Sequence, residues 1–143
     1  MKTFAAWLLS ATLACCGVAI AADGATAAAA IPGPATGASF PHQLSAPDQT
    51  GKIRDLPSLM GSKGLALLFV RSADWCPFCK RQLADINQQL ARFQALGINV
   101  ASVSVDTVEL VAGFVAAQQI GYPMLADPKG DINLQLGIRD EQY

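Results

Sequence analysis

Residues 65–83 of the chain read LALLFVRSADWCPFCKRQL, and this stretch decides the fold. Leu65–Val70 is an unbroken apolar run, which is typical of a strand buried on both faces in a central parallel sheet. Two cysteines, Cys76 and Cys79, follow after a short loop, and Pro77 comes directly after the first of them. Because an amphipathic pattern begins there, we expect the cysteine pair to lie at the start of a helix.

The helix that starts at the cysteines is the clearest in the sequence. Its apolar positions recur every three or four residues with polar residues between them, and they are Leu83, Ile86, Leu90 and Phe93. The pattern predicts a single helix that ends at Gly97. Beyond it, Ile98–Val105 alternates with the period of a strand.

A second helix is predicted after that strand. Asp106 and, three positions later, Glu109 resemble a capping box at its start, and the pattern fades near Gln119. Tyr122–Ala126 is expected to form a short strand and Asp127–Gly130 a turn. This alternation of strands and helices predicts an α/β fold built from βαβ units with right-handed parallel crossovers.

The segment ahead of the first buried strand predicts a hairpin or a looser turn. Asp48–Gly51 lies between apolar residues, an aspartate can hydrogen-bond its own backbone in a turn, and a glycine can take a positive φ. Leu56–Leu59 is expected to form a short turn or helix.

The N-terminus resembles a secretory signal peptide. Lys2 supplies a positive charge, Phe4–Ala14 is almost entirely apolar, and Ala19 and Ala21 place small residues where a signal peptidase would cleave. The apolar run is short for a membrane-spanning helix, which needs about 20 residues. We therefore expect cleavage after Ala21, export to the periplasm or the medium, and no transmembrane span.

Two further features precede the domain. Leu13–Cys16 resembles part of a bacterial lipoprotein signal, so a lipid anchor at Cys15 or Cys16 is the minor alternative to simple cleavage. Residues 22–38 contain mostly Ala, Gly, Thr and Pro with a single charge, a composition that cannot repay its ordering entropy by burial. We interpret residues 1–21 as the signal peptide, 22–38 as a flexible linker and 39–143 as one domain.

Composition excludes several classes of function. The chain has 143 residues, 52% of them hydrophobic and 15% charged, with 10 basic and 11 acidic side chains and a formal net charge of −1. This length accommodates one domain at most. Because no basic stripe is present, neither nucleic acid nor an anionic membrane surface is expected as a partner.

Cysteine chemistry is the strongest functional signal. Once the leader is removed, Cys76 and Cys79 are the only cysteines and His42 is the only histidine, so a structural zinc site would lack ligands. Lys80, not histidine, follows the second cysteine, which argues against covalent haem attachment. We therefore expect no metal and no cofactor.

The expected position of Cys76 at a helix N-terminus would activate its sulfur. Free backbone N–H groups and the helix dipole favour thiolate over thiol, and Pro77 occupies a position where its missing N–H costs nothing. Lys80 and Arg81 add positive charge nearby. A thiol pKa lowered from about 8.5 to about 7 raises the reactive fraction at neutral pH more than tenfold. Cys79, one turn further on, is then the resolving thiol.

A permanent stabilising disulfide is the alternative interpretation of the pair. A bridge across two residues closes a small loop and restrains the unfolded chain little, which favours a redox role. The neighbouring aromatic residues, Trp75 and Phe78, are candidates for substrate contact, although either could be an ordinary core residue.

The residues 73–80, ADWCPFCK, in a strand-to-helix turn resemble the active site of the thioredoxin superfamily. Over residues 39–143 the wider pattern is similar to the redoxin branch that contains the alkyl hydroperoxide reductase and thiol-specific antioxidant proteins. The matching segments are Asp48–Gly51, Leu65–Val70, Ser102–Asp106 and Tyr122–Pro128. The resemblance implies a thioredoxin-like fold with a central sheet flanked by helices.

The chain departs from these families at positions that matter. The proline and threonine that precede the peroxidatic cysteine of peroxiredoxins correspond to Phe69 and Ala73, which puts peroxidase activity in doubt. The buried aspartate of thioredoxins corresponds to Val70, so Asp74 is the nearest candidate base, and a solvated loop acid is its simpler interpretation.

The family's cis-proline faces the cysteine pair and contacts substrate backbone, and Pro123 is spaced suitably for it. On the redoxin pattern, however, the chain ends at Tyr143 before the last strands and helix. The resemblance therefore also implies a domain truncated at the C-terminus.

These observations predict an exported thiol-disulfide oxidoreductase that acts on protein thiols and disulfides. Cys76 would attack and Cys79 resolve, with Trp75, Pro77, Phe78 and Pro123 in contact with substrate and an unidentified electron donor completing the cycle. The Pro-Phe dipeptide resembles that of glutaredoxins, which implies a potential of roughly −230 to −180 mV. A peroxiredoxin-like thiol peroxidase with antioxidant activity is the second interpretation, and a non-catalytic redoxin-like binding module or truncated remnant is the third.

Overall fold

The computed structural model describes residues 33–40 and 43–139. The predicted signal peptide, the cysteines Cys15 and Cys16, and His42 lie outside these residues, as does most of the predicted linker. Export, lipidation and the proposed domain boundaries therefore remain predictions.

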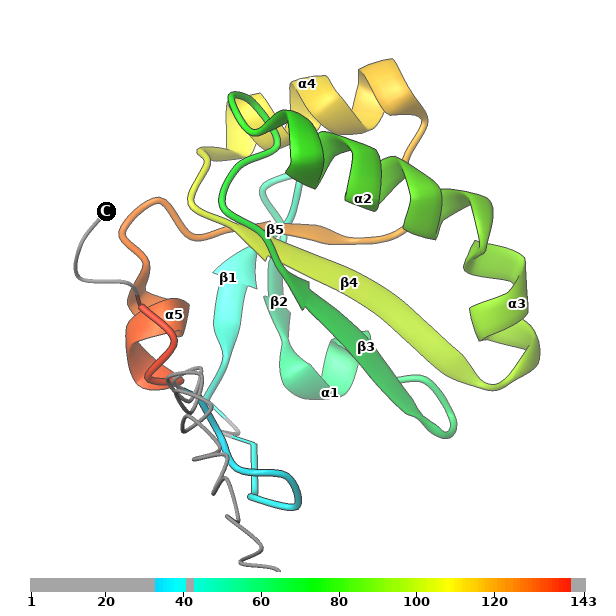
Figure 1. Ribbon diagram of the computed structural model, residues 1–143, viewed down its shortest axis with the longest axis vertical. Coiled ribbons are helices and arrows are strands. Elements are labelled where there is room, and N and C mark those ends of the chain that lie inside the picture. The colour runs from blue at the N-terminus through cyan, green and yellow to red at the C-terminus, as the bar shows by residue number, and fades with distance from the viewer. Residues whose placement is uncertain (1–32, 41–42, 140–143) are drawn as a thin grey trace, which may run out of the picture. The chain divides into compact units, whose positions relative to one another are not determined.

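Five strands and five helices make up the described residues (Figure 1). In chain order they are β1 (Ser45–Pro47), β2 (Ile53–Asp55), α1 (Leu56–Leu59), β3 (Gly64–Phe69), α2 (Pro77–Gln88), α3 (Leu90–Ala95), β4 (Ile98–Ser104), α4 (Val108–Gln118), β5 (Met124–Ala126) and α5 (Asp131–Gln135).

The central sheet is parallel, with the order β3-β4-β5. Phe69 pairs with Val103, and Ser104 pairs with Ala126, so all three strands end near one edge. Helices α2 and α4 cover one face, while the β1–β2 hairpin, α1 and α5 lie on the other (Figure 1). The parallel sheet and its flanking helices confirm the α/β prediction.

Alternation along β4 divides the core into two clusters. Val100 packs toward α2 and α4 with Leu83 and Phe114, whereas Val103 packs against Leu125 and the α5 side. A strand sends successive side chains to opposite faces, so one buried strand supplies both clusters.

Strand β3 is less buried than its sequence predicts. All six of its residues, Gly64–Phe69, are partly exposed, whereas β4 is buried from Val100 onward. The reason is topological, because among the described residues β3 pairs with β4 alone and forms the edge of the sheet. The prediction that Leu65–Val70 is a central strand buried on both faces is therefore wrong, and β4 has the central position instead.

The single long helix predicted after the cysteines is broken. Gln89, with φ −98° and ψ 3°, separates α2 from α3, and its N–H donates to the carbonyl of Ile86. The apolar pattern nevertheless continues across the break, since Ile86, Leu90 and Phe93 all pack against the same core cluster. Gly97, at φ +75°, ends α3 and leads into β4.

Helix α4 is capped by a residue other than the predicted one. The Thr107 side chain accepts from the N–H of Leu110, so Thr107 is the N-cap, and Asp106 is buried elsewhere. Helix α5 was absent from the sequence predictions. It follows the predicted Asp127–Gly130 turn, and the Asp127 carboxylate accepts hydrogen bonds from the first N–H groups of the helix.

The predicted hairpin is confirmed, and Asp48 is its anchor. The buried carboxylate accepts hydrogen bonds from Thr50 and Lys52 and pairs with the Arg54 guanidinium, Nε to Oδ2 2.7 Å. Burial alone would raise the pKa of Asp48, but the hydrogen bonds from Thr50, Arg54 and Lys52 outweigh it and lower the pKa to about 2.

Candidate active site

The cysteine pair lies at the start of α2, after the loop that connects β3 to this helix. Cys76 is the N-cap of α2, and its Sγ accepts a hydrogen bond from the backbone N–H of Cys79, 3.2 Å away. Pro77 begins the helix, as predicted. Cys76 is 1% and Cys79 9% exposed, and a disulfide joins them with their Cα atoms 5.3 Å apart.

Buried polar groups shape the loop in front of Cys76. The Ser72 hydroxyl accepts from the N–H groups of Asp74 and Trp75, at 2.9 and 3.1 Å, and donates to the Asp106 carboxylate at 2.7 Å. The second carboxylate oxygen of Asp106 accepts from the N–H of Ala73 at 2.6 Å. Ser72 and Asp106 therefore connect the active-site loop to the end of β4.

Arg71 brings a positive charge to the sulfur. Its Nη2 lies 3.6 Å from Cys76 Sγ, and its guanidinium carbon lies 5.2 Å from the centre of the Trp75 ring. A cation and an N–H donor at a sulfur stabilise its anionic form. Sequence reasoning assigned this role to Lys80 and Arg81 and overlooked Arg71, which precedes Cys76 by five residues.

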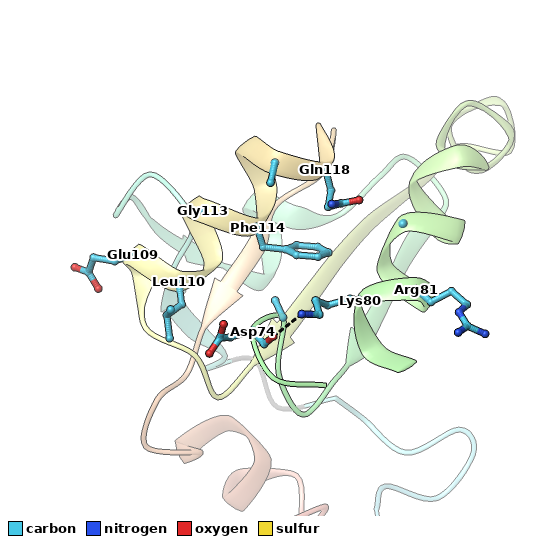
Figure 2. Close-up of a pocket in the computed structure, with 11 residues that line it drawn as sticks. Asp74, Lys80, Arg81, Glu109, Leu110, Gly113, Phe114 and Gln118 are labelled. Atoms are coloured by element: carbon cyan, nitrogen blue, oxygen red, sulfur yellow. Dashed lines mark hydrogen bonds between the residues drawn. The ribbon is translucent and has the colours of Figure 1, made fainter. Parts of the chain in front are cut away.

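Lys80 has a different role from the predicted one. Its Nζ donates to the backbone carbonyl of Asp74 at 2.6 Å, so it fastens the loop to α2. Arg81 lines a hollow of about 590 Å³ between α2 and α4, where Asp74, Glu109 and Phe114 also lie (Figure 2). Lys80 therefore contacts the loop, and Figure 2 shows the Arg81 side chain pointing away from α4.

The aromatic neighbours of the cysteines are exposed. Trp75 is 57% and Phe78 72% accessible, and Pro77 between them is also exposed. These three side chains form an apolar collar at the cysteine pair, so the structure brings together five of the six predicted site residues. Substrate contact by the collar stays a prediction.

Pro123 does not join this group. Every peptide bond of the described residues is trans, and Pro123 lines a separate hollow together with Leu59, Leu90 and Gln94. It precedes β5, and its carbonyl accepts from the N–H of Ser102. The expectation that Pro123 is a cis-proline facing the cysteines is wrong, because parallel strands carry the site at their opposite, carboxyl ends.

The positions that differ from the peroxiredoxin and thioredoxin patterns carry no replacement group. Val70 and Ala73 are buried and apolar, so neither offers a hydroxyl or a base to the sulfurs. Asp74 is exposed, in keeping with its interpretation as a solvated loop acid.

A second hollow, of about 440 Å³, opens beside Trp75. Its lining includes the apolar residues Phe69, Val105 and Ile138 and the cations Lys129 and Arg139. Over the described ranges, no set of three or more His, Cys, Asp or Glu side chains is arranged to hold a metal. No helix within those ranges is long and apolar enough to cross a membrane.

Comparison with known proteins identifies relatives of the chain. The sequence profile of the AhpC/TSA family matches residues 36–143. A putative peroxiredoxin of Mycobacterium tuberculosis is 30% identical over 93 residues, which is 65% of this chain and 60% of that protein. A peroxiredoxin of Aeropyrum pernix is 30% identical over 113 residues, 73% of this chain and 44% of that protein.

Solved structures agree. The crystal structure of peroxidoxin BcpB from Mycobacterium tuberculosis superposes with a TM-score of 0.61 at 28% identity, covering 66% of this chain and 60% of that one. Peroxiredoxin Q of Xanthomonas campestris has the same fold, with a TM-score of 0.60 at 24% identity, covering 67% of this chain and 59% of that one.

The chain thus spans about 60% of the length of the first of these relatives. Its thioredoxin-like α/β fold, with a central sheet flanked by helices, is the fold that the sequence predicted. The profile match covers most of the chain. The chain belongs to the AhpC/TSA family.

Proposed function

We propose that this protein is an exported thiol-disulfide oxidoreductase whose Cys76–Cys79 pair cycles between dithiol and disulfide. One observation carries the proposal: the two sulfurs are bonded across the first turn of α2, with Cys76 Sγ held by an N–H group and by Arg71. Such an arrangement stabilises the thiolate that attacks and keeps the second thiol close enough to finish the reaction.

The reaction runs through a mixed disulfide. The Cys76 thiolate attacks one sulfur of a partner disulfide, a bond forms between the two proteins, and the partner's other sulfur leaves as a thiolate. Cys79, after losing its proton, attacks Cys76 Sγ, closes the intramolecular bond and releases the second partner sulfur. A dithiol donor then returns two electrons to the pair by the reverse exchange.

The exposed collar of Trp75, Pro77 and Phe78 fits a peptide substrate. Both sulfurs are buried, so a partner must lie against the protein around them before exchange can occur. Flat, exposed aromatic rings supply contact area at little cost in side-chain entropy. The partner proposed is therefore a protein segment rather than a small thiol alone.

A thiol peroxidase is the second candidate, and the relatives favour it, since several are described as peroxiredoxins. In that reaction the Cys76 thiolate attacks a peroxide oxygen, an alcohol or water leaves, and Cys76 becomes a sulfenic acid. Cys79 then attacks that sulfur, and water is released as the disulfide forms. Ala73 counts against this candidate, because no hydroxyl stands three residues ahead of Cys76 to align a peroxide.

Trapping separates these functions from a non-catalytic role. In the purified Cys79→Ser variant, a disulfide oxidoreductase accumulates a mixed disulfide with a test protein disulfide, detectable as a thiol-sensitive shift in mass. The matched Cys76→Ser variant keeps only Cys79, whose sulfur lacks the contacts with Arg71 and the helix N–H group that activate Cys76, and should trap far less. Equal trapping by both variants, or trapping by neither, would contradict the assigned roles.

A comparison of two reaction rates decides between the two enzymatic candidates. The reduced chain is mixed separately with hydrogen peroxide and with the test protein disulfide, and Trp75 fluorescence follows closure of the bridge. We expect fast closure with the disulfide and slow closure with peroxide. The reverse order would make the protein a peroxidase that functions without the threonine.

Export has its own test. The full chain is expressed in a bacterial host, and the N-terminus of the protein recovered outside the cytoplasm is sequenced. We expect it to begin at Ala22. A lipid-modified N-terminus at Cys15 or Cys16 would establish the lipoprotein alternative, and an intact Met1 on cytoplasmic protein would contradict export.

A further inference from the structure

The hollow of about 440 Å³ beside Trp75 has an unusual distribution of charge. Three of its lining residues are cations, Arg71, Lys129 and Arg139, and none is acidic. Its other lining residues are apolar or uncharged and include Phe69 and Val105. We call this hollow the cationic groove.

Within residues 33–40 and 43–139, no ion pair neutralises the cations of the cationic groove. Among the described residues the salt bridge is that of Arg54 with Asp48, which lies in the hairpin, so the three groove cations have no ion-pair partner there. The whole chain carries a formal net charge of −1, which makes a site with three cations a local reversal of sign. Like charges gathered around one cavity repel each other, and an anion in the cavity relieves that repulsion.

The hollow on the other side of the cysteines provides a comparison. It lies between α2 and α4, and there Lys80 and Arg81 are accompanied by Asp74 and Glu109 (Figure 2). Its charges balance, so it offers no preference for an anion. The preference is a property of the cationic groove alone among the hollows that flank the cysteine pair in the described residues.

Two residues that line the cationic groove adjoin Cys76. Arg71 lines the groove and also contacts Cys76 Sγ at 3.6 Å, while Trp75, another lining residue, immediately precedes that cysteine. A peptide that lies in the groove would therefore place its own sulfur at Cys76 when its cysteine follows or precedes the bound residues closely.

We propose that the cationic groove binds the carboxylates of an acidic peptide segment next to the substrate disulfide. The inference rests on the proposed exchange function and specifies its substrate class. The apolar lining residues accept aliphatic parts of the peptide, and Lys129 and Arg139 meet its carboxylates. Electrostatic complementarity of this kind acts mainly on association and specificity, so it weakens as salt screens the charges.

Binding is measured first without redox chemistry. The probes are three synthetic peptides with serine in place of cysteine, flanked by two glutamates, two glutamines or two lysines, and titrated calorimetrically into the oxidised full chain. We expect the glutamate peptide to bind at least tenfold more tightly than the lysine peptide at low salt, and the difference to shrink at high salt. Equal affinity of the three peptides would overturn the proposal.

Charge-removing variants locate the site. Lys129→Gln and Arg139→Gln are each expected to lower the affinity for the glutamate peptide about threefold and to leave the affinity for the glutamine peptide unchanged. The matched control is Lys63→Gln, which removes the same charge from an exposed position beyond the opposite end of β3. An equal loss in Lys63→Gln would attribute the effect to net charge and overturn the site.

The cysteine forms of the same peptides, as disulfides, separate this inference from the proposed function. If the reduced chain reacts with all three at the same rate, exchange stands and the cationic groove has no role in selecting substrate. If the serine form of the glutamate peptide binds but the disulfide form of the same peptide is not reduced, the binding role of the cationic groove is supported and the proposed function fails. If the glutamate disulfide is reduced faster than the other two, and Lys129→Gln removes this advantage, both the exchange function and the binding role of the cationic groove are supported.

Discussion

The reactivity of Cys76 depends on a residue that the cysteine motif does not contain. Arg71 lies between the sulfur and the Trp75 ring, within 3.6 Å of the former and 5.2 Å of the centre of the latter. A guanidinium keeps its charge at every accessible pH, so its effect on the sulfur is constant. The sequence contains no sign of this contact, because an arginine at the end of a strand is more often a solvated residue.

Removal of this charge should slow the attacking thiol. In a Cys79→Ser background, Arg71→Met is expected to lower the alkylation rate of Cys76 at pH 7 about fivefold, because less of it is thiolate. The readout is the rate of reaction with iodoacetamide as a function of pH, whose midpoint should move upward. Arg71→Lys, which keeps the charge, should recover most of the rate, and identical profiles for all variants would contradict the role.

Ser72 acts on the shape of the loop. Ser72→Ala removes the acceptor for the N–H groups of Asp74 and Trp75 and takes the hydroxyl donor from one of the two Asp106 carboxylate oxygens. The free energy of unfolding should fall by about 1–3 kcal/mol, as measured by denaturant titration. Ser62→Ala is the control, since that exposed hydroxyl makes one long contact of 3.5 Å, and it should change stability by less than about 0.5 kcal/mol. Similar losses in both variants would contradict the loop assignment.

At the scale of elements, the parts that could be predicted are those with a strong period. The apolar spacing gave the helix after Cys76 and the strand after Gly97, and both formed where expected. The break at Gln89 and helix α5 could not be predicted in this way. The helix breaks at Gln89 although the apolar spacing continues past this residue, so the spacing does not reveal the break. Helix α5 has five residues, too few to display a period.

The residues of the candidate site also fall into those that the local sequence pattern predicts and those that it does not. Cys76, Cys79 and Pro77 were predictable because a helix start imposes its chemistry locally. Ser72 and Asp106 were not, since 34 residues separate two side chains that meet only through the pairing of β3 with β4. Pro123 was misplaced for a related reason, because its distance from the cysteines depends on which end of β5 it occupies.

The β1–β2 hairpin should carry a distinct acid sensitivity. Asp48 has a pKa lowered from 3.8 to about 2 in the folded protein, so its contribution to stability is complete above pH 4 and is lost as the pH falls toward 2. The contribution is about 2 kcal/mol. Denaturant titrations between pH 5 and pH 2 should therefore show a steeper loss for the unmodified chain than for Asp48→Asn.

The control for this acid titration is Asp85→Asn, which removes an exposed carboxylate from α2. It should retain the steep loss seen in the unmodified chain. Parallel curves for the unmodified chain and Asp48→Asn would show that the hairpin carboxylate does not carry the effect.

At the scale of the whole molecule, the main feature is that β3 forms an open edge of the central sheet in the described residues. The N–H of Val70 bonds the carbonyl of Val103, and N–H groups along a parallel strand alternate between its two neighbours. The N–H groups of Leu68 and Val70 therefore point toward β4. Those of Leu67 and Phe69 point toward the edge, where the described residues offer no partner.

Amide hydrogen exchange should reveal this alternation. We expect Leu67 and Phe69 to exchange at least a hundredfold faster than Leu68 and Val70, in a monomeric sample followed by nuclear magnetic resonance. The neighbouring residues on one strand serve as each other's controls. Equal protection of all four would mean that another strand covers this edge, from the same chain or from a second copy.

The bond between Asp106 and the active-site loop determines how the molecule tolerates change. Although Cys76 follows β3 in the chain, the loop that carries it is attached to the end of β4, the strand with a neighbour on each side. Fraying or redesign of the edge strand can therefore proceed while the nucleophile keeps its place. In an engineered or evolving relative, the position of Cys76 should therefore depend on the Ser72–Asp106 hydrogen bond and on β4 more than on the edge strand β3.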